Sequence, residues 1–250
     1  MTQKYEVSND EWNVRCDLAA CYRLCFLLKI TDRINTHISA KVTGTSDEFL
    51  LNPVGLLFDE VTASNLVKLN YAGKKIDNQN ALEFNSAGYV IHSAILESRA
   101  DVSCVIHHHS IAAISVGIIE EGFLPLDQHG FQFYGKIGYH DYKGFGTSIS
   151  DEKKRLSKDM GDKKILFMRN HGVLICGSTV GEAFCLMDDL EQACKVQIAT
   201  LSMNKKLRLP SDEIINLTVN QFDSIGRPGG EKEWPAMKRI LERKGIKYQI

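Results

Sequence analysis

Hydrophobic and polar residues follow two different periods along the chain, and these periods alternate. Apolar residues recur at helical spacing in four segments, residues 9–30, 85–98, 110–122 and 179–203. Apolar runs typical of strands lie between them, at residues 36–42, 48–58, 102–109 and 163–177. Residues 59–70 begin with a polar cluster typical of a helix cap. Strands that alternate with helices predict a layered domain of the α/β or α+β class.

The sequence changes character after the last long helix. Residues 204–230 are polar and contain the segment "GRPGG", so we expect a wrapping or flexible connector there. Residues 231–246 predict a short terminal helix. The expected organisation is therefore a main domain over residues 1–203 and a C-terminal part over 204–250. This part is expected to pack on the same domain or on a neighbouring subunit.

Composition narrows the class of protein. The 250 residues are 44% hydrophobic, which favours one large domain over two small ones. Basic and acidic residues balance at 30 and 31, so neither nucleic acid nor an anionic membrane surface is an expected partner. The apolar runs are too short to cross a bilayer, and the polar N-terminus lacks the apolar stretch of a signal peptide. Together with an odd number of cysteines, seven, this leads us to expect a cytoplasmic protein.

Three consecutive histidines in "CVIHHHS" are the strongest candidates for chemistry. On a strand, His107 and His109 point to one face and His108 points to the other. His171, in the turn "RNHG" between two short strands, can project into the same cleft and supply a third imidazole. Three neutral imidazoles with one open position are typical of catalytic zinc, although another divalent metal could take the site. The alternative is that they are ordinary polar residues at the rim of a strand.

The motifs around these histidines resemble those of a known family. "RADVSCVIHHHS", followed by "ILFMRNHGVLICGSTVGEAFCLMDDLEQAC", is similar to the class II aldolase/adducin family, over roughly residues 10–203. Within the family, "GLLFDEVTASNLVKLN", "GYHDYKG" and "WPAMKRILERKGIKY" resemble the adducin head branch. We therefore expect a free-standing head domain without the adducin tail.

The resemblance implies a fold, an assembly and a chemistry. It implies a three-layer α/β/α domain with a mostly antiparallel central sheet, assembled as a homo-oligomer, commonly a tetramer with active sites between subunits. It places the family's metal ligands on His107, His109 and His171. Family enzymes polarise a small-molecule substrate on zinc and carry out aldol cleavage, epimerisation, dehydration or decarboxylation through a metal-bound oxyanion.

The position of the family's catalytic carboxylate differs in this chain. In the aldolases a carboxylate at the start of a helix, eleven residues before the "RPD" motif, takes and returns a proton. Counting back from Arg99 places Gly88 there, and glycine can be neither acid, base nor ligand. The nearest carboxylate on that helix is Glu97, which we interpret as a solvated surface residue.

The phosphate-binding loops of the aldolases are also altered. His37 and Val54 stand where the resemblance predicts an asparagine and a threonine. The candidate substrate-binding residues that remain are Ser39, Gly55 and Ser86. Lys41 or Arg33 could supply the missing charge. Because a phosphate needs several donors, a sugar-phosphate substrate is disfavoured.

One further histidine is a candidate catalytic residue. In the aldolases a tyrosine after the metal strand protonates the leaving carbon, and an alignment from Pro125 places His129 near that position. Histidine titrates near neutral pH and can donate a proton, but His129 could equally be an ordinary loop residue. We interpret His92 as a core residue or a support for the ligands, and His140 as a packing or hydrogen-bonding residue.

Two functions remain open from the sequence. The first is a zinc-dependent, lyase-like enzyme that acts on a small hydroxy-carbonyl or carboxylate compound without the usual carboxylate. The second is a non-catalytic, adducin-like oligomerisation or interaction protein that retains a metal site. The three histidines favour a retained metal site, because a purely structural head has no need for convergent imidazoles.

Overall fold

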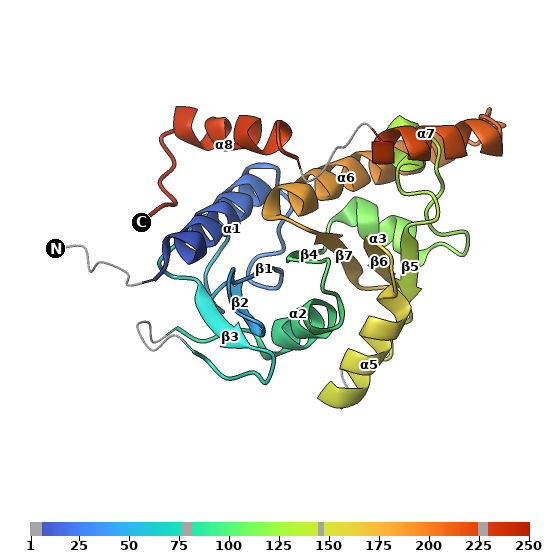
Figure 1. Cartoon of the computed structure of the whole chain (residues 1–250). Coiled ribbons are helices and arrows are strands. Elements are labelled where there is room, and N and C mark those ends of the chain that lie inside the picture. The colour runs from blue at the N-terminus through green and yellow to red at the C-terminus, as the bar shows by residue number, and fades with distance from the viewer. Residues whose placement is uncertain (1–6, 77–81, 145–147, 225–229) are drawn as a thin grey trace.

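A seven-stranded sheet forms the centre of the molecule (Figure 1). The computed structural model describes residues 7–76, 82–144, 148–224 and 230–250. The strand order is β3-β2-β1-β4-β7-β6-β5, and of these neighbours only β5 and β6 run parallel. The strands are β1 His37–Lys41, β2 Glu48–Leu51, β3 Val67–Asn70, β4 Cys104–His108, β5 Ile137–His140, β6 Ile165–Met168 and β7 Gly172–Gly177.

Helices cover both faces of this sheet. One face packs against α1 (Asn9–Leu27), α3 (Ile111–Ile118) and α6 (Val180–Ser202), and α8 (Glu233–Arg243) lies outside them against α1 and α6. The other face packs against α2 (Ser86–Ser98) and α5 (Ile149–Met160). The three-layer α/β/α architecture with a mostly antiparallel sheet, expected from the resemblance, is thereby confirmed.

Alternation along β4 decides which way its histidines point. Cys104 and Ile106 belong to the apolar core beneath α1 and α6, whereas Val105 belongs to the core beneath α2 and α5. His107 therefore shares the α2 side with Val105, and His108 points to the opposite side. All five residues of β4 are buried, since the strand lies at the centre of the sheet.

A serine cap ends β4 immediately after the histidines. The Ser110 hydroxyl accepts a hydrogen bond from the Ala113 backbone N–H at 3.1 Å, and so begins α3. The same hydroxyl donates to the Glu191 carboxylate on α6 at 2.5 Å, which fixes the turn against the helical layer. His109 therefore lies in the turn between strand and helix, one residue beyond the end of β4.

Several elements differ from the expectations. Residues 67–70 form β3, although the polar cluster before them is typical of a helix cap. The pattern did not predict α4 (Gln128–Phe131), β5 or α5. The expected connector contains α7 (Asp212–Ser224), in which Ile215 is the buried residue. Residues 225–229 of that connector lie outside the described residues.

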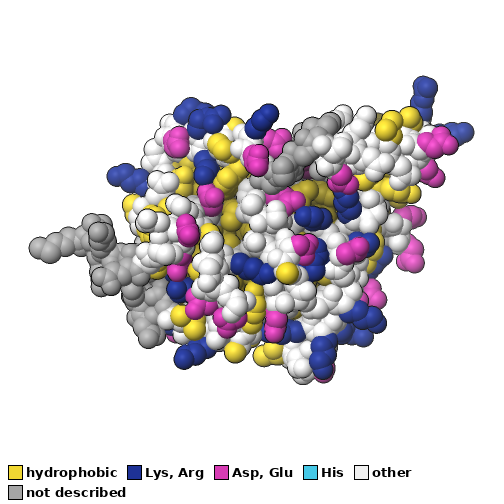
Figure 2. Space-filling view, in the orientation of Figure 1, with side chains coloured by type: hydrophobic (Ala, Val, Ile, Leu, Met, Phe, Trp, Pro, Cys, Tyr) yellow, Lys and Arg dark blue, Asp and Glu magenta, His cyan; other side chains and the backbone are white. Residues whose placement is uncertain are grey.

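On the face of the molecule drawn in Figure 2, neither positively nor negatively charged side chains predominate. Lysine and arginine side chains there are interspersed with aspartate and glutamate, as the balanced composition predicts. Among the helices that the structure describes, none is long and apolar enough to cross a membrane.

Candidate metal centre

Two histidines from the end of β4 are oriented by hydrogen bonds to their Nδ1 atoms. His107 is buried, and its Nδ1 lies 3.1 Å from the carbonyl oxygen of Val173 on the neighbouring strand β7. His109 Nδ1 lies 3.1 Å from a carboxylate oxygen of Asp32. Since both partners accept hydrogen bonds, each neutral ring carries its proton on Nδ1 and leaves a lone pair on Nε2.

The third histidine is placed by a tight turn between β6 and β7. Asn170 adopts a left-handed φ of 61°, and the His171 backbone N–H donates to the Met168 carbonyl at 3.0 Å. At Gly172 an added Cβ would lie 2.6 Å from the His108 carbonyl oxygen and 2.7 Å from a ring carbon of His109. Only glycine therefore allows this turn to approach the end of β4, which explains the segment "RNHG" in physical terms.

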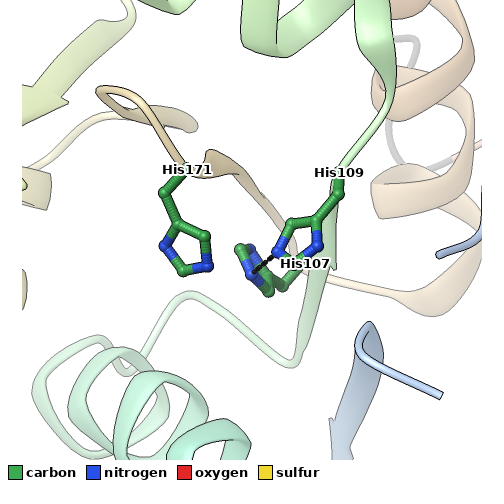
Figure 3. A group of neighbouring side chains, drawn as sticks. All are labelled: His107, His109 and His171. Carbon is green, nitrogen blue, oxygen red and sulfur yellow. Dashed lines mark hydrogen bonds between the residues drawn. The ribbon is translucent and has the colours of Figure 1, made fainter. Parts of the chain in front are cut away.

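The three imidazoles converge (Figure 3). The ring centroids of His107, His109 and His171 lie 4.8 to 4.9 Å from one another. One ligand atom from each residue lies within 4.8 Å of the other two, and Nε2 of His107 lies 3.0 Å from Nε2 of His109. The structure thus brings together the three residues that the sequence selects as metal ligands.

The electrostatics of this cluster fit a bound cation. Burial lowers the pKa of His107 well below its usual value, and burial together with the nearby His109 and His140 lowers the pKa of His171 to about 4. His107 and His171 are therefore neutral at pH 7, and each offers a nitrogen lone pair to a cation. Nitrogen ligands of tetrahedral zinc lie about 3.3 Å apart, close to the 3.0 Å between Nε2 of His107 and Nε2 of His109, so the residues fit a divalent ion.

Asp32 is a site residue that the sequence did not reveal. It lies in the segment between α1 and β1, and the hydrogen bond from His109 is the main cause that lowers the pKa of its carboxyl group. Arg33 follows it, with Nε 3.3 Å from the Asp32 carboxylate. Asp32 and His109 are 77 residues apart in the chain, and no local pattern links them.

A pocket opens beside His171. Its apolar wall comes from α2 and β6, with Val90, Ile91 and Met168, and its polar wall includes His140 and Arg169. Both ring nitrogens of His140 are engaged by carboxylates, Nδ1 by Asp159 at 2.8 Å and Nε2 by Glu152 at 3.0 Å. His140 is therefore a hydrogen-bonding residue, as expected, and it forms part of the pocket lining.

The candidate substrate-binding residues lie in different surroundings. Ser39 is fully buried in β1, and its hydroxyl lies 2.5 Å from Nδ1 of His92. Ser86 is exposed at the first position of α2, and Gly55 occupies a turn with a φ of 91°. A bridge between Pro53 and Phe84 brings these two segments side by side. Neither Gly55 nor Ser86 lines the pocket beside His171, and the Ser39 hydroxyl is engaged by His92.

The structure also shows where Lys41, Glu97 and Val54 lie. The Lys41 ammonium donates to the Arg99 carbonyl at 2.7 Å, at the end of β1 away from the histidines. Glu97 is 56% exposed and lies 3.6 Å from Lys153, as expected of a surface residue. The side chain of Val54 is 40% exposed.

His129 lies on the short helix α4, against α6. Its Nδ1 is 3.1 Å from the Asp127 carboxylate, its Nε2 is 3.9 Å from Asp189, and half of its side chain is exposed. These partners, rather than the three converging histidines, are its neighbours within the described residues. A catalytic role for His129 stays a prediction that depends on a second copy of the chain.

Comparison with known proteins agrees with this geometry. The family model for the class II aldolase and adducin N-terminal domain matches residues 16–198. The chain belongs to this family. A Pseudomonas aeruginosa protein that is named a putative aldolase class 2 protein is 42% identical over 248 residues, covering 98% of this chain and 95% of that protein. Alpha-adducin of Rattus norvegicus is 35% identical over 252 residues, covering 94% of this chain and 34% of adducin.

Solved structures of class II aldolase family members share the fold. An aldolase II superfamily protein from Pseudomonas syringae superimposes with a TM-score of 0.91 at 44% identity, covering 98% of both chains. An L-fuculose 1-phosphate aldolase from Glaciozyma antarctica superimposes with a TM-score of 0.82 at 21% identity, covering 99% of this chain and 96% of the other. At that identity the second likeness shows the fold alone.

Proposed function

We propose that this class II aldolase family chain is a metal-dependent, lyase-like enzyme that uses zinc held by His107, His109 and His171. The observation that carries the proposal is the convergence of Nε2 of His107 and Nε2 of His109, which lie 3.0 Å apart while an acceptor lies beside each Nδ1. Two imidazole nitrogens at that spacing can bind one shared cation. His171 completes the three-histidine set that catalytic zinc uses.

The bound ion, the residues that orient its ligands and the pocket beside it would have separate roles. Zinc supplies Lewis acidity that polarises a substrate oxygen and stabilises charge that develops on it. Asp32 and the Val173 carbonyl hold the ligand rings in the required tautomer. The pocket beside His171 offers an apolar wall and the cationic Arg169, which suits a small hydroxy-carbonyl or carboxylate compound.

The proposed enzyme works as an oligomer, in keeping with the family. His129 is exposed and lies away from the ligands of its own subunit, so it can act only at the site of a neighbouring copy. We propose a homotetramer in which His129 supplies the proton that the position-88 carboxylate does not. Gly55 and Ser86 border the substrate in this arrangement.

A second candidate is an interaction protein of the adducin kind. Two observations favour it: the 35% identity to alpha-adducin across 94% of this chain, and the glycine at position 88. It requires no turnover, although it is compatible with a bound ion. The two candidates therefore differ in whether the loaded protein moves a substrate proton.

Metal analysis and proton exchange test the proposal in sequence. Purified protein should contain about one zinc per chain by mass spectrometry, and His171→Ala should lose most of it, whereas His129→Ala should retain it. The zinc protein should then exchange a C–H proton next to the carbonyl of a small hydroxy-ketone or 2-oxo acid in D2O. Zinc without exchange on any compound of these classes would favour the interaction protein, and no zinc would refute the metal site.

A further inference from the structure

Two buried polar atoms near the centre of the sheet have no hydrogen-bond partner among the residues that the structure describes. They are the hydroxyl oxygen of Thr36, immediately before β1, and Nε2 of His108, the last residue of β4. Thr36 is 0% exposed and His108 is 1% exposed, so bulk solvent does not reach them. Buried polar atoms in native proteins almost always have a partner, and an ordered internal water is one of the usual partners.

The register of the sheet places these two residues opposite each other. The strands β1 and β4 are antiparallel, and His37 pairs with His107. Thr36 precedes His37, and His108 follows His107. The next opposite pair is therefore Thr36 and His108. Side chains at opposite positions of antiparallel strands share a face, with Cβ atoms about 4.5–5.5 Å apart. The register thus brings the two side chains that carry the unpartnered atoms to one place in the fold.

The face that they share is the one that α1 and α6 cover. Ile38 and Ile106 alternate in step with Thr36 and His108 along β1 and β4, and both isoleucines belong to the apolar core beneath these helices. His107 points to the opposite face. The sheet therefore separates this place from the three converging histidines, and an inference about it does not rest on the proposed function.

The hydrogen bond at the other ring nitrogen fixes the role of His108 Nε2. The backbone N–H of Ser110 donates to Nδ1 of His108 at 3.2 Å. A backbone N–H can only donate, so Nδ1 presents its lone pair and the proton of the ring is on Nε2. The unpartnered atom of His108 is therefore a donor that requires an acceptor. A metal cation cannot take this place, because it needs a lone pair on Nε2.

A water molecule suits both atoms. Its oxygen accepts the Nε2–H of His108, and the Thr36 hydroxyl can either donate to that oxygen or accept one of its hydrogens. Two polar partners lie at the lower end of the range of about two to four that buried waters have. An apolar molecule would satisfy neither atom. An anion would need a positive partner, and a His108 ring with a lone pair at Nδ1 is neutral.

We propose that one ordered internal water binds between Thr36 and His108 and joins the start of β1 to the end of β4. The hydrogen bonds then run from the Ser110 backbone through the His108 ring and the water to Thr36. The same two segments are also joined by the hydrogen bond between His109 and Asp32. The water is thus a second link between the turn after β4 and the segment before β1.

A crystal structure of the metal-free protein, at a resolution that shows ordered waters, tests the site directly. Native protein should show one water within about 2.7–3.2 Å of both Thr36 Oγ1 and His108 Nε2. Thr36→Ser keeps the hydroxyl and should retain this water, whereas Thr36→Val keeps the shape of the side chain and should lose it. A native structure without a water bonded to both atoms would overturn the proposal, as would the same water in Thr36→Val.

A double-mutant cycle in metal-free protein tests whether the two residues act through one molecule. Thr36→Val should lower the folding equilibrium constant roughly five- to a hundredfold, because it leaves the Nε2–H of His108 without its bridge. In a His108→Phe background the water has already lost its donor, so the same change should have a clearly smaller effect. The loss of the Ser110 partner in His108→Phe is common to both arms and cancels.

A variant that keeps the donor is the matched control for this cycle. His108→Gln places an amide N–H near the position of Nε2, so Thr36→Val should again have an effect close to the one in native protein. Equal effects of Thr36→Val in the native and His108→Phe backgrounds would show that no water connects the two residues, and would overturn the proposal.

Discussion

The Asp32 carboxylate accepts the Nδ1–H of His109 at 3.1 Å, so a residue of the segment before β1 decides which nitrogen of His109 faces the other two histidines. Carboxylates that orient metal-binding histidines in this way typically contribute 10- to 100-fold to metal affinity. Asp32→Ala should therefore weaken zinc binding by about that factor, measured by competition with a chelator. Asp127→Ala is the matched control, because Asp127 bonds His129 in the same way but lies away from the ligands. Equal zinc affinity in both variants would show that Asp32 does not orient His109.

His129 gives a second prediction, which separates turnover from metal content. Once a substrate is found, His129→Ala should reduce turnover by roughly 10²- to 10⁴-fold, because general acid catalysis contributes that much. Its zinc content should stay near one per chain, since its neighbours are Asp127 and Asp189 rather than the ligands. An unchanged rate would show that His129 is an ordinary surface residue without a catalytic role.

The central strands of the sheet could be predicted from the sequence because they are buried on both faces and rich in β-branched residues. The helices α3 and α6 could be predicted for a similar reason, since each begins at a clear cap, Ser110 or Thr179. The helix α7 was not predicted, because the polar composition and the segment "GRPGG" of residues 204–230 indicate a connector; in the structure it buries Ile215 and leaves Ile214 and Leu217 half exposed.

The three converging histidines could be selected because strand alternation and the "RNHG" turn are local signals. The surroundings of the ligands could not, since Asp32 and His37 reach the site through tertiary contacts with His109 and His107. Gly88 is instructive in this respect. The sequence marks it as a missing carboxylate, and only the structure shows that a ring from β1 occupies the space.

Activity toward L-fuculose 1-phosphate provides a third prediction. The resemblance to the aldolases implies that Gly88 stands in place of a carboxylate that relays a proton, a step worth about 10²- to 10⁴-fold. The resemblance also implies that His37 and Val54 stand in place of two phosphate donors, each worth on the order of 1–3 kcal/mol if uncompensated. A coupled assay on zinc-loaded protein should therefore detect no practical cleavage. Turnover at ordinary enzyme rates would show that another group replaces the carboxylate.

The oligomeric state is a fourth prediction. Apolar side chains on α6 and α7 are exposed, with Leu201 at 41% and both Ile214 and Leu217 at 51%, so they have surface to cover. Light scattering at micromolar concentration should give a mass near four times the 28.1 kDa chain. Leu217→Asp should lower that mass while the far-ultraviolet circular dichroism stays unchanged. A native protein that runs as a monomer would rule out the tetramer.

The last prediction concerns stability at mildly acidic pH, and it depends on a histidine that faces away from the metal site. His108 is 1% exposed, its Nδ1 accepts a hydrogen bond from the Ser110 N–H at 3.2 Å, and burial lowers its pKa to about 3. Unfolded histidine has a pKa of about 6.5. Between these values the unfolded chain binds one more proton than the folded chain, so stability is complete above about pH 6.5 and falls as the pH decreases.

The size of this effect follows from the same two pKa values. Each such histidine lowers the free energy of unfolding by up to about 1.4 kcal/mol per pH unit, which amounts to about 2 kcal/mol at pH 5. His108→Asn keeps an acceptor for the Ser110 N–H and does not titrate. Urea unfolding of metal-free protein should be measured between pH 5 and 6.5. The free energy of unfolding should change less steeply with pH in the variant, by the slope that corresponds to about one bound proton. His92 has a pKa lowered to about 3 by burial, so it contributes a similar slope that remains in both proteins. An identical slope for native protein and His108→Asn would mean that His108 is already charged in the folded state.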